Sequence, residues 1–134
     1  MRMVQLLFLA GIALTVACTA ATPTPSPLTG QWGGRQVRLT LDTAGGRIEY
    51  DCAAGTFDKP LLLDAEGNFS NSGKHEDYAK GPTNPDAPPA SADVIYNGKI
   101  TGDQMALLVR VAGEKTPRSF TLVRGQNVKL VRCM

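Results

Sequence analysis

The chain has 134 residues, of which 43% are hydrophobic and 19% are charged, and its 14 basic and 12 acidic side chains give a formal net charge of +2. This length suits one domain and is too short for two of ordinary size. The two signs of charge are mixed along the sequence without a basic cluster, which argues against nucleic acid as a partner.

The first seventeen residues have the pattern of an export signal. Arg2 supplies a positive charge, an apolar run extends from Leu6 to Val16, and small residues precede Cys18. The apolar run is too short to span a bilayer as a mature helix. We therefore expect residues 1–17 to be a signal peptide that is removed during export.

The end of this signal, Val16-Ala17-Cys18, resembles the lipobox of bacterial lipoproteins, with Thr15 where Leu is more usual. The resemblance implies lipidation of Cys18 and stable attachment to a membrane, because several acyl chains hold a protein far better than one. It also implies a place in the bacterial cell envelope. Thr19 resembles the sorting pattern of outer-membrane lipoproteins, which face the periplasm or the cell surface. An ordinary secretory signal, cleaved nearby, is the alternative.

Residues 18–27 form a linker rich in threonine and proline. The stretch from Thr19 to Pro27 contains three prolines and has no apolar face, which favours an extended and semi-stiff backbone. At about 3.1 Å per extended residue, this tether should hold the domain within a few nanometres of the bilayer. Residues 28–134 then remain for a single folded domain.

The rest of the sequence alternates between apolar and polar residues over short stretches, which predicts an antiparallel all-β domain. Val37, Leu39 and Leu41, for example, share one face of a strand. Turn residues separate these stretches, and none of them has the period of a helix. Eight strands are predicted, at Gln36–Leu41, Arg47–Ala54, Phe57–Asp64, Asn68–His75, Ala92–Ile100, Gln104–Val111, Arg118–Arg124 and Val128–Cys133.

The stretch Ala79–Ser91 contains four prolines and is expected to be one long surface loop, because proline cannot donate to a sheet. Eight strands joined in sequence can close into a barrel, which removes the exposed edges of the sheet. We therefore predict an all-β fold, an eight-stranded antiparallel up-and-down barrel. A two-sheet β-sandwich has the same number of strands and is the alternative.

Cys52 and Cys133 remain once Cys18 carries lipid, and export places them in an oxidising compartment. We expect a disulfide between them, which would close a loop of about 80 residues and stabilise the fold by about 4 kcal/mol in the chain-entropy model. In an eight-stranded meander both cysteines lie near strand ends at the same rim. Free buried thiols and a redox pair are the alternatives, but neither cysteine lies in a CxxC motif.

The segment Gly30-Gln31-Trp32 resembles the opening of calycin-type barrels, the lipocalin and avidin group, in which a Gly-x-Trp enters the first strand. In those proteins the indole plugs the barrel floor, and an Arg from near the end of the barrel packs over it. The resemblance implies that Trp32 forms the floor here and that Arg132 supplies the cation. The whole pattern also resembles small bacterial lipoproteins, a kinship that implies no activity.

His75 is the single histidine and lies among charged residues at the end of a predicted strand. A zinc site usually needs more His or Cys ligands than are left here. Adjacent residues on a strand point to opposite faces, which argues against a Ser-His-Asp arrangement around His75. We interpret His75 as part of a solvated, mixed-charge strand end, and we predict no metal, no cofactor and no enzymatic activity.

The tether and the barrel pattern favour a non-enzymatic, lipid-anchored binding module of the cell envelope. Its expected partners are the membrane, through the lipid on Cys18, and a small apolar ligand or an envelope protein. A periplasmic protease inhibitor built on a small β-barrel is the alternative, with residues 19–27 as its trunk. In a third interpretation, the long loop at Ala79–Ser91 contacts a partner in a structural or adhesive role.

Overall fold

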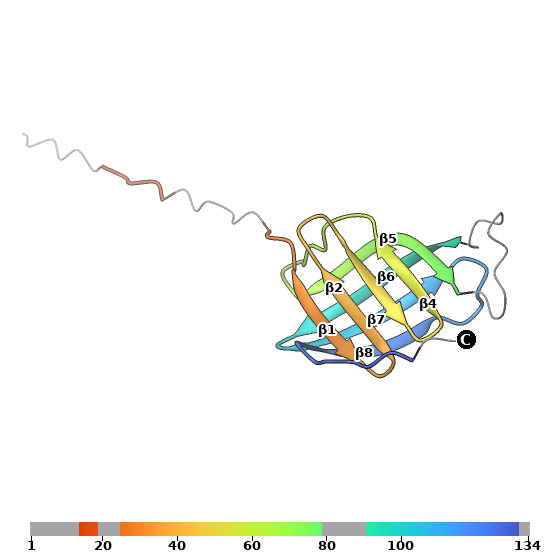
Figure 1. Cartoon of the computed structure of the whole chain (residues 1–134). Coiled ribbons are helices and arrows are strands. Elements are labelled where there is room, and N and C mark those ends of the chain that lie inside the picture. The colour runs from red at the N-terminus through yellow and green to blue at the C-terminus, as the bar shows by residue number, and fades with distance from the viewer. Residues whose placement is uncertain (1–13, 19–24, 79–90, 132–134) are drawn as a thin grey trace, which may run out of the picture.

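The computed structural model describes residues 14–18, 25–78 and 91–131. Within these ranges the chain forms eight strands and no helix (Figure 1). The first four strands have 5 residues each, β5 and β6 have 10 and 11, and most strands carry the alternating burial that their sequences predict. The strands are β1 Gly30–Gly34, β2 Val37–Leu41, β3 Gly46–Tyr50, β4 Ala53–Phe57, β5 Asn68–Asp77, β6 Ser91–Thr101, β7 Gln104–Val111 and β8 Arg118–Arg124.

The sheet closes into a barrel (Figure 1). Every strand pairs antiparallel with the next one in sequence, and β1 also pairs antiparallel with β8. The predicted eight-stranded antiparallel up-and-down barrel is therefore confirmed, and the chain does not form the alternative sandwich. The closing seam is short, because it joins only Trp32 to Arg124 and Gly33 to Val123.

The second half of the barrel follows the predicted strands closely. β7 and β8 have the predicted bounds, and β5 and β6 are each longer than predicted by one or two residues at their ends. Ser91, which the sequence assigns to the long loop, begins β6; residues 79–90 lie outside the described residues. Strict alternation over many residues makes these strands predictable, since one face must be buried.

The prediction of one strand over Arg47–Ala54 is wrong, because this stretch forms β3 and β4 with a hairpin at Asp51 and Cys52. No Gly, Pro or Asn marks this turn in the sequence. Tyr50 and Ala53 flank the two turn residues and are both buried, so the sequence shows no clear break between the two strands. Cys52 is half-buried in the turn rather than facing inward from a strand.

The prediction of a strand over Phe57–Asp64 is also wrong beyond Phe57, where β4 ends. Residues 58–67 run beside β5 as an irregular segment. The Asp58 amide donates to the Ser72 carbonyl at 2.9 Å, and the Asn71 side-chain amide donates to the Lys59 carbonyl at 2.8 Å. Pro60 has no amide hydrogen to continue a ladder, which explains the irregular path.

The last predicted strand, Val128–Cys133, does not form over its described part, and residues 132–134 lie outside the described residues. The barrel contains β1 in place of this predicted strand. β1 has three glycines, which lack side chains, so its sequence does not show the alternation of apolar and polar residues. Gly33 is required there, because a Cβ would lie 2.2 Å from the Gln126 carbonyl oxygen. The C-terminal segment therefore crosses β1 in direct contact with its backbone.

Inward-facing side chains fill the barrel with a continuous core. Trp32, Leu39, Ile48, Tyr96 and Met105 are all fully buried. Tyr96 stacks on Phe57 with ring centroids 4.0 Å apart. An eight-stranded barrel is just wide enough for side chains to fill its interior, and this one is occupied by its own residues. The complete cluster is Trp32, Val37, Leu39, Leu41, Ile48, Tyr50, Ala53, Phe57, Leu61, Phe69, Val94, Tyr96, Met105, Leu107, Val109, Val111 and Leu122.

Candidate functional site

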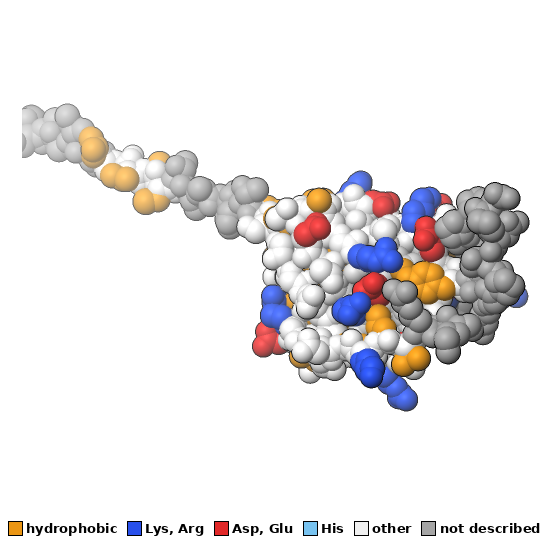
Figure 2. All heavy atoms as spheres, viewed as in Figure 1, with side chains coloured by type: hydrophobic (Ala, Val, Ile, Leu, Met, Phe, Trp, Pro, Cys, Tyr) orange, Lys and Arg blue, Asp and Glu red, His pale blue; other side chains and the backbone are white. Residues whose placement is uncertain are grey.

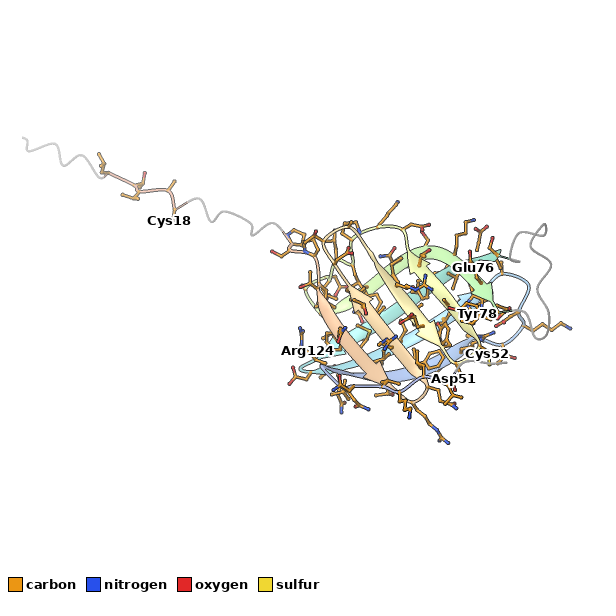
Figure 3. All side chains as sticks on the ribbon, in the orientation of Figure 1. Cys18, Asp51, Cys52, Glu76, Tyr78 and Arg124 are labelled. Carbon is orange, nitrogen blue, oxygen red and sulfur yellow. The ribbon has the colours of Figure 1, made fainter. Side chains whose placement is uncertain are left out.

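The two ends of the barrel differ in chemistry, and we name them by their buried markers. The Trp32 end carries the start of β1, the turn 42–45 and the loop 58–67; the His75 end carries the turn 51–52 and the loop 112–117. Figure 3 shows Arg124 at the first end and Asp51, Cys52 and Tyr78 together at the second.

At the Trp32 end an arginine covers the indole. Trp32 is fully buried, and the Cζ of Arg124 lies 4.4 Å from the centroid of its ring. The two residues are direct partners in the β1–β8 register. Asp103 also contacts the guanidinium, with 3.5 Å between Arg124 Nε and Asp103 Oδ1. Arg132, which the sequence predicts for this contact, lies outside the described residues.

A second apolar contact closes the same end. The Leu28 amide donates to the Leu61 carbonyl at 2.8 Å, and Leu61 is buried. Leu28 and Leu63 pack against the core cluster. The chain therefore enters the barrel beside the 58–67 loop, and the Trp32 end is sealed by aliphatic side chains.

At the His75 end, polar groups are enclosed within the barrel. His75 is only 1% exposed, so the interpretation of a solvated strand end is wrong. The alternation of β5 continues through Gly73 to His75, which turns the imidazole inward between β4 and β6. Its Nε2 lies 3.1 Å from Asp77 Oδ1, and its ring is 5.9 Å from that of Tyr50.

Four enclosed polar atoms have no hydrogen-bond partner among the described residues. They are the Trp32 Nε1, the Tyr50 hydroxyl, the His75 Nδ1 and the Tyr96 hydroxyl. Burial raises the pKa of both tyrosines well above the ordinary value, although the positive Arg118 opposes the rise at Tyr50. The interior is thus apolar in bulk and carries isolated polar atoms, of which the imidazole and the Tyr50 hydroxyl lie together at the His75 end.

A groove at the outer surface runs between the C-terminal segment and strands β2 and β3. It has a volume of about 580 Å³ and a lining of both aromatic and charged side chains. The C-terminal segment is held there by the Val131 amide, which donates to Asp51 Oδ1 at 3.0 Å. We call this the tail groove; its lining residues are Arg38, Tyr50, Tyr78, Asn127, Val128, Lys129 and Leu130.

A charge network borders the tail groove. The Arg38 guanidinium donates two hydrogen bonds to Glu49 Oε2, at 2.6 and 2.9 Å, and Arg47 Nε lies 3.6 Å from Glu49 Oε1. The hydrogen bond from Arg38 lowers the pKa of Glu49. Arg47 also donates to the Tyr78 hydroxyl at 3.4 Å. With Lys129 in the lining and Asp51 at the C-terminal segment, three cations accompany two carboxylates, so this border carries a small excess of positive charge.

The cysteines are only partly described. Cys18 is exposed and its thiol is free. Cys52 lies next to Asp51, which binds the backbone of Val131. Cys133 lies outside the described residues, so the Cys52–Cys133 disulfide stays a prediction.

Sequence reasoning missed the features that build this region. Tyr78, Arg38 and Asn127 are far apart in the sequence and carry no motif. Arg124 could have been found, because it ends a correctly predicted strand on the inward parity of Phe120 and Leu122. The tail groove could not have been found from the sequence, because it depends on the path of the C-terminal segment. The alternation of apolar and polar residues predicts a strand for that segment.

Over the described ranges, no three His, Cys, Asp or Glu side chains lie close enough together to hold a metal ion. The same part of the chain has no helix that is long and apolar enough to cross a membrane. Comparison of the sequence and the structure with protein-family models, curated proteins and solved structures finds no match.

Proposed function

We propose that this chain is a lipid-anchored protein of the bacterial cell envelope that binds a partner protein in its tail groove. The lipobox-like end of the signal supports the anchor, and Cys18 is exposed with a free thiol that an acyl transfer could use. A binding role fits better than a catalytic one, because the imidazole that could do acid–base chemistry is enclosed in the barrel.

We choose a partner protein rather than a small apolar ligand because side chains fill the interior of the barrel. Trp32, Tyr96 and Met105 are fully buried along the barrel, so we place the binding surface outside rather than inside. The tail groove offers Tyr78 and Arg38, and aromatic and Arg side chains are enriched at protein interfaces. Its cationic border favours a partner segment with an acidic side chain. A small apolar ligand fits this border poorly.

The anchor is tested by the intact mass of the mature protein from its native membranes. We expect loss of residues 1–17 and an added acyl mass on Cys18. The Cys18→Ala variant should lose that mass and leave the membrane fraction. An unacylated chain cut at another position would contradict the anchor and leave a secreted protein, for which protease inhibition would be assayed next.

The partner is tested by photo-cross-linking in cells. A photoreactive amino acid in place of Asn127, which is exposed in the groove, should capture a specific protein, whereas the same probe in place of Ser119, exposed on β8, should not. With the purified partner, Tyr78→Ala should weaken binding about tenfold or more, as for an interface hot spot. Equal capture from both positions, or unchanged affinity of Tyr78→Ala, would contradict a role for the groove.

We also propose that a Cys52–Cys133 disulfide fixes one wall of this groove. Cys133 is two residues beyond Val131, whose amide is bound to the neighbour of Cys52. Such a bridge would hold the C-terminal segment against the barrel in an oxidising compartment. Peptide mapping without reduction should recover the two cysteines in one linked fragment; recovery of separate, alkylated peptides would contradict the bridge.

A further inference from the structure

A second groove on the outer wall of the barrel combines apolar and polar side chains. It is lined by the apolar Pro60, Leu62 and Ile95 and by the polar Lys59, Ser70, Asn71 and Ser72. It has a volume of about 470 Å³ and lies between the 58–62 segment and strands β5 and β6. Leu62 and Ile95 line it and are 47% and 49% exposed, so a pair of large aliphatic side chains meets solvent in one groove. Figure 2 shows one face of the barrel, on which charged side chains of both signs are interspersed with hydrophobic areas.

The apolar side chains in this groove are held in place rather than loosely exposed. Leu61 is buried in the core, so the next residue along the segment, Leu62, is directed outward. The hydrogen bond from Asn71 to the Lys59 carbonyl fixes the start of the segment against β5. Ile95 lies opposite Ser72 on the same outer wall. The groove is therefore a preformed surface.

The groove also lies where the tether joins the domain. The Leu28 amide donates to the carbonyl of Leu61, which is the neighbour of Leu62. Nine residues lie between Cys18 and Leu28. The ten steps from one Cα to the next span at most about 35 Å when fully extended. A bilayer that holds an acyl chain on Cys18 would thus always be within reach of Leu62.

Two cations flank the apolar pair. Lys59 lines the groove beside Pro60, and Arg110 is the β7 partner of Ile95 in the sheet register. Lys and Arg at the rim of an apolar surface can direct their charge to lipid headgroups while their stems lie on the acyl boundary. The other lining residues of the groove are neutral, so apolar burial would dominate its contact with a bilayer.

We propose that Pro60, Leu62 and Ile95 form a membrane-contact face, which lies against the bilayer that carries the lipid on Cys18. The inference rests on the proposed lipid anchor. Two half-exposed aliphatic side chains would bind a free bilayer only weakly, but a short tether raises the effective concentration of the face at the membrane. The contact orients the domain, and it leaves the tail groove, on another face and nearer the opposite end, open to partners.

The test uses the lipoprotein purified from membranes and reconstituted into phosphatidylcholine vesicles with or without brominated acyl chains. Leu62→Trp introduces a reporter on the face, and the fully buried Trp32 provides a background measured in the parent protein. The control is Thr40→Trp, because Thr40 is exposed near the same barrel end on β2, four strands away from β6. We expect brominated lipid to quench the new indole of Leu62→Trp at least twofold more than that of Thr40→Trp.

A second variant checks the contact itself. Ile95→Ser in the Leu62→Trp background should reduce the quenching by at least half without a change in secondary structure, because Ile95 faces solvent. Added salt up to 0.5 M should leave the quenching unchanged. Equal quenching at both reporter positions, or none at either, overturns the membrane-contact face. If no quenching occurs but a cross-linker at Leu62 captures a protein, the groove belongs to a protein partner instead.

The same preparation separates this inference from the proposed anchor. Intact mass of the reconstituted protein reports the acyl chain on Cys18 independently of fluorescence. An acylated protein without preferential quenching overturns the membrane-contact face alone. A protein without acyl mass overturns both the anchor and the face that depends on it.

Discussion

The two ends of this barrel differ in how they satisfy their buried groups. At the Trp32 end, aliphatic side chains seal the core, and Arg124 covers the indole while its charge is met by Asp103. Four buried side-chain atoms have no hydrogen-bond partner among the described residues. The indole Nε1 lies at the Trp32 end, the Tyr50 hydroxyl and His75 Nδ1 lie together at the His75 end, and the Tyr96 hydroxyl lies beside Gly55, the register partner of His75. Apolar packing and hydrogen bonding of buried polar groups are thus more complete at the Trp32 end than at the His75 end.

That difference suggests that one end of the barrel stabilises the fold and the other takes part in binding. Buried polar groups without partners and poorly packed regions tend to occur at the functional sites of proteins. The tail groove lies next to the His75 end, where Tyr50 both lines the groove and packs on His75. We therefore expect substitutions at the Trp32 end to change stability, and substitutions near the His75 end to change binding with a smaller cost in stability.

The largest expected effect comes from removing the indole. Trp32→Ala should destabilise the domain by about 3–5 kcal/mol, because it leaves a large cavity in a fully buried position. Tyr50→Ala at the other end should cost less, about 2–3 kcal/mol, because Tyr50 lines the tail groove and part of the space that it leaves is open to solvent. Urea unfolding of both variants measures the contrast, and equal losses would remove the distinction between the two ends.

The next largest effect concerns the close approach of the C-terminal segment to β1. Gly33→Ala places a Cβ 2.2 Å from the Gln126 carbonyl oxygen and should cost about 1–3 kcal/mol or displace the segment. Hydrogen exchange of residues 126–131 would report the displacement. Gln31→Ala, at an exposed position on the same strand, is the control and should change neither quantity.

Alkaline pH should weaken the domain through its buried tyrosines. Burial raises the folded-state pKa of Tyr50 and Tyr96 above the unfolded value of about 10. Their contribution is complete below pH 10 and is lost as the pH rises further, because the unfolded chain ionises first, by about 1.4 kcal/mol per pH unit for each group. Urea unfolding of the parent and of Tyr96→Phe between pH 9 and 11 should show a shallower decline in the variant; identical slopes would contradict the raised pKa.

The smallest expected effect is that of the cation over the indole. Arg124→Gln should lower stability by about 0.5–1 kcal/mol, since Arg124 is half-exposed and its ion pair with Asp103 is long. Arg110→Gln serves as the matched control on the outer wall. A loss above about 2 kcal/mol would mean that the β1–β8 seam depends on this residue far more than its contacts indicate.

Much of the fold could be predicted because alternation is a strong signal where one face is buried. β7 and β8 have the predicted ends. Eight strands joined in sequence favour a closed barrel, but a sandwich has the same number of strands, and the structure decides between the two. The hairpin at Asp51 and Cys52 could not be recognised, because Asp51 alone is a weak turn signal and no Gly, Pro or Asn accompanies it. β1 was missed because glycine has no side chain to show a pattern.

The candidate site was less predictable than the fold for a physical reason. His75 was interpreted from its charged neighbours, but its environment is decided by the strands on each side of it. The tail groove needs the C-terminal segment to leave the sheet at Gly125 and return toward Asp51. Such contacts between distant segments have no local signature in one sequence.

The short seam between β1 and β8 also affects the order of events during folding. β8 completes the barrel and is the last of the eight strands to be synthesised, so Trp32 cannot be enclosed until all of these strands have left the ribosome. Folds that depend on such distant pairings form slowly. A chain that cannot fold early stays unfolded for longer, which would suit the export that we propose and would leave its apolar strands open to aggregation until the barrel closes.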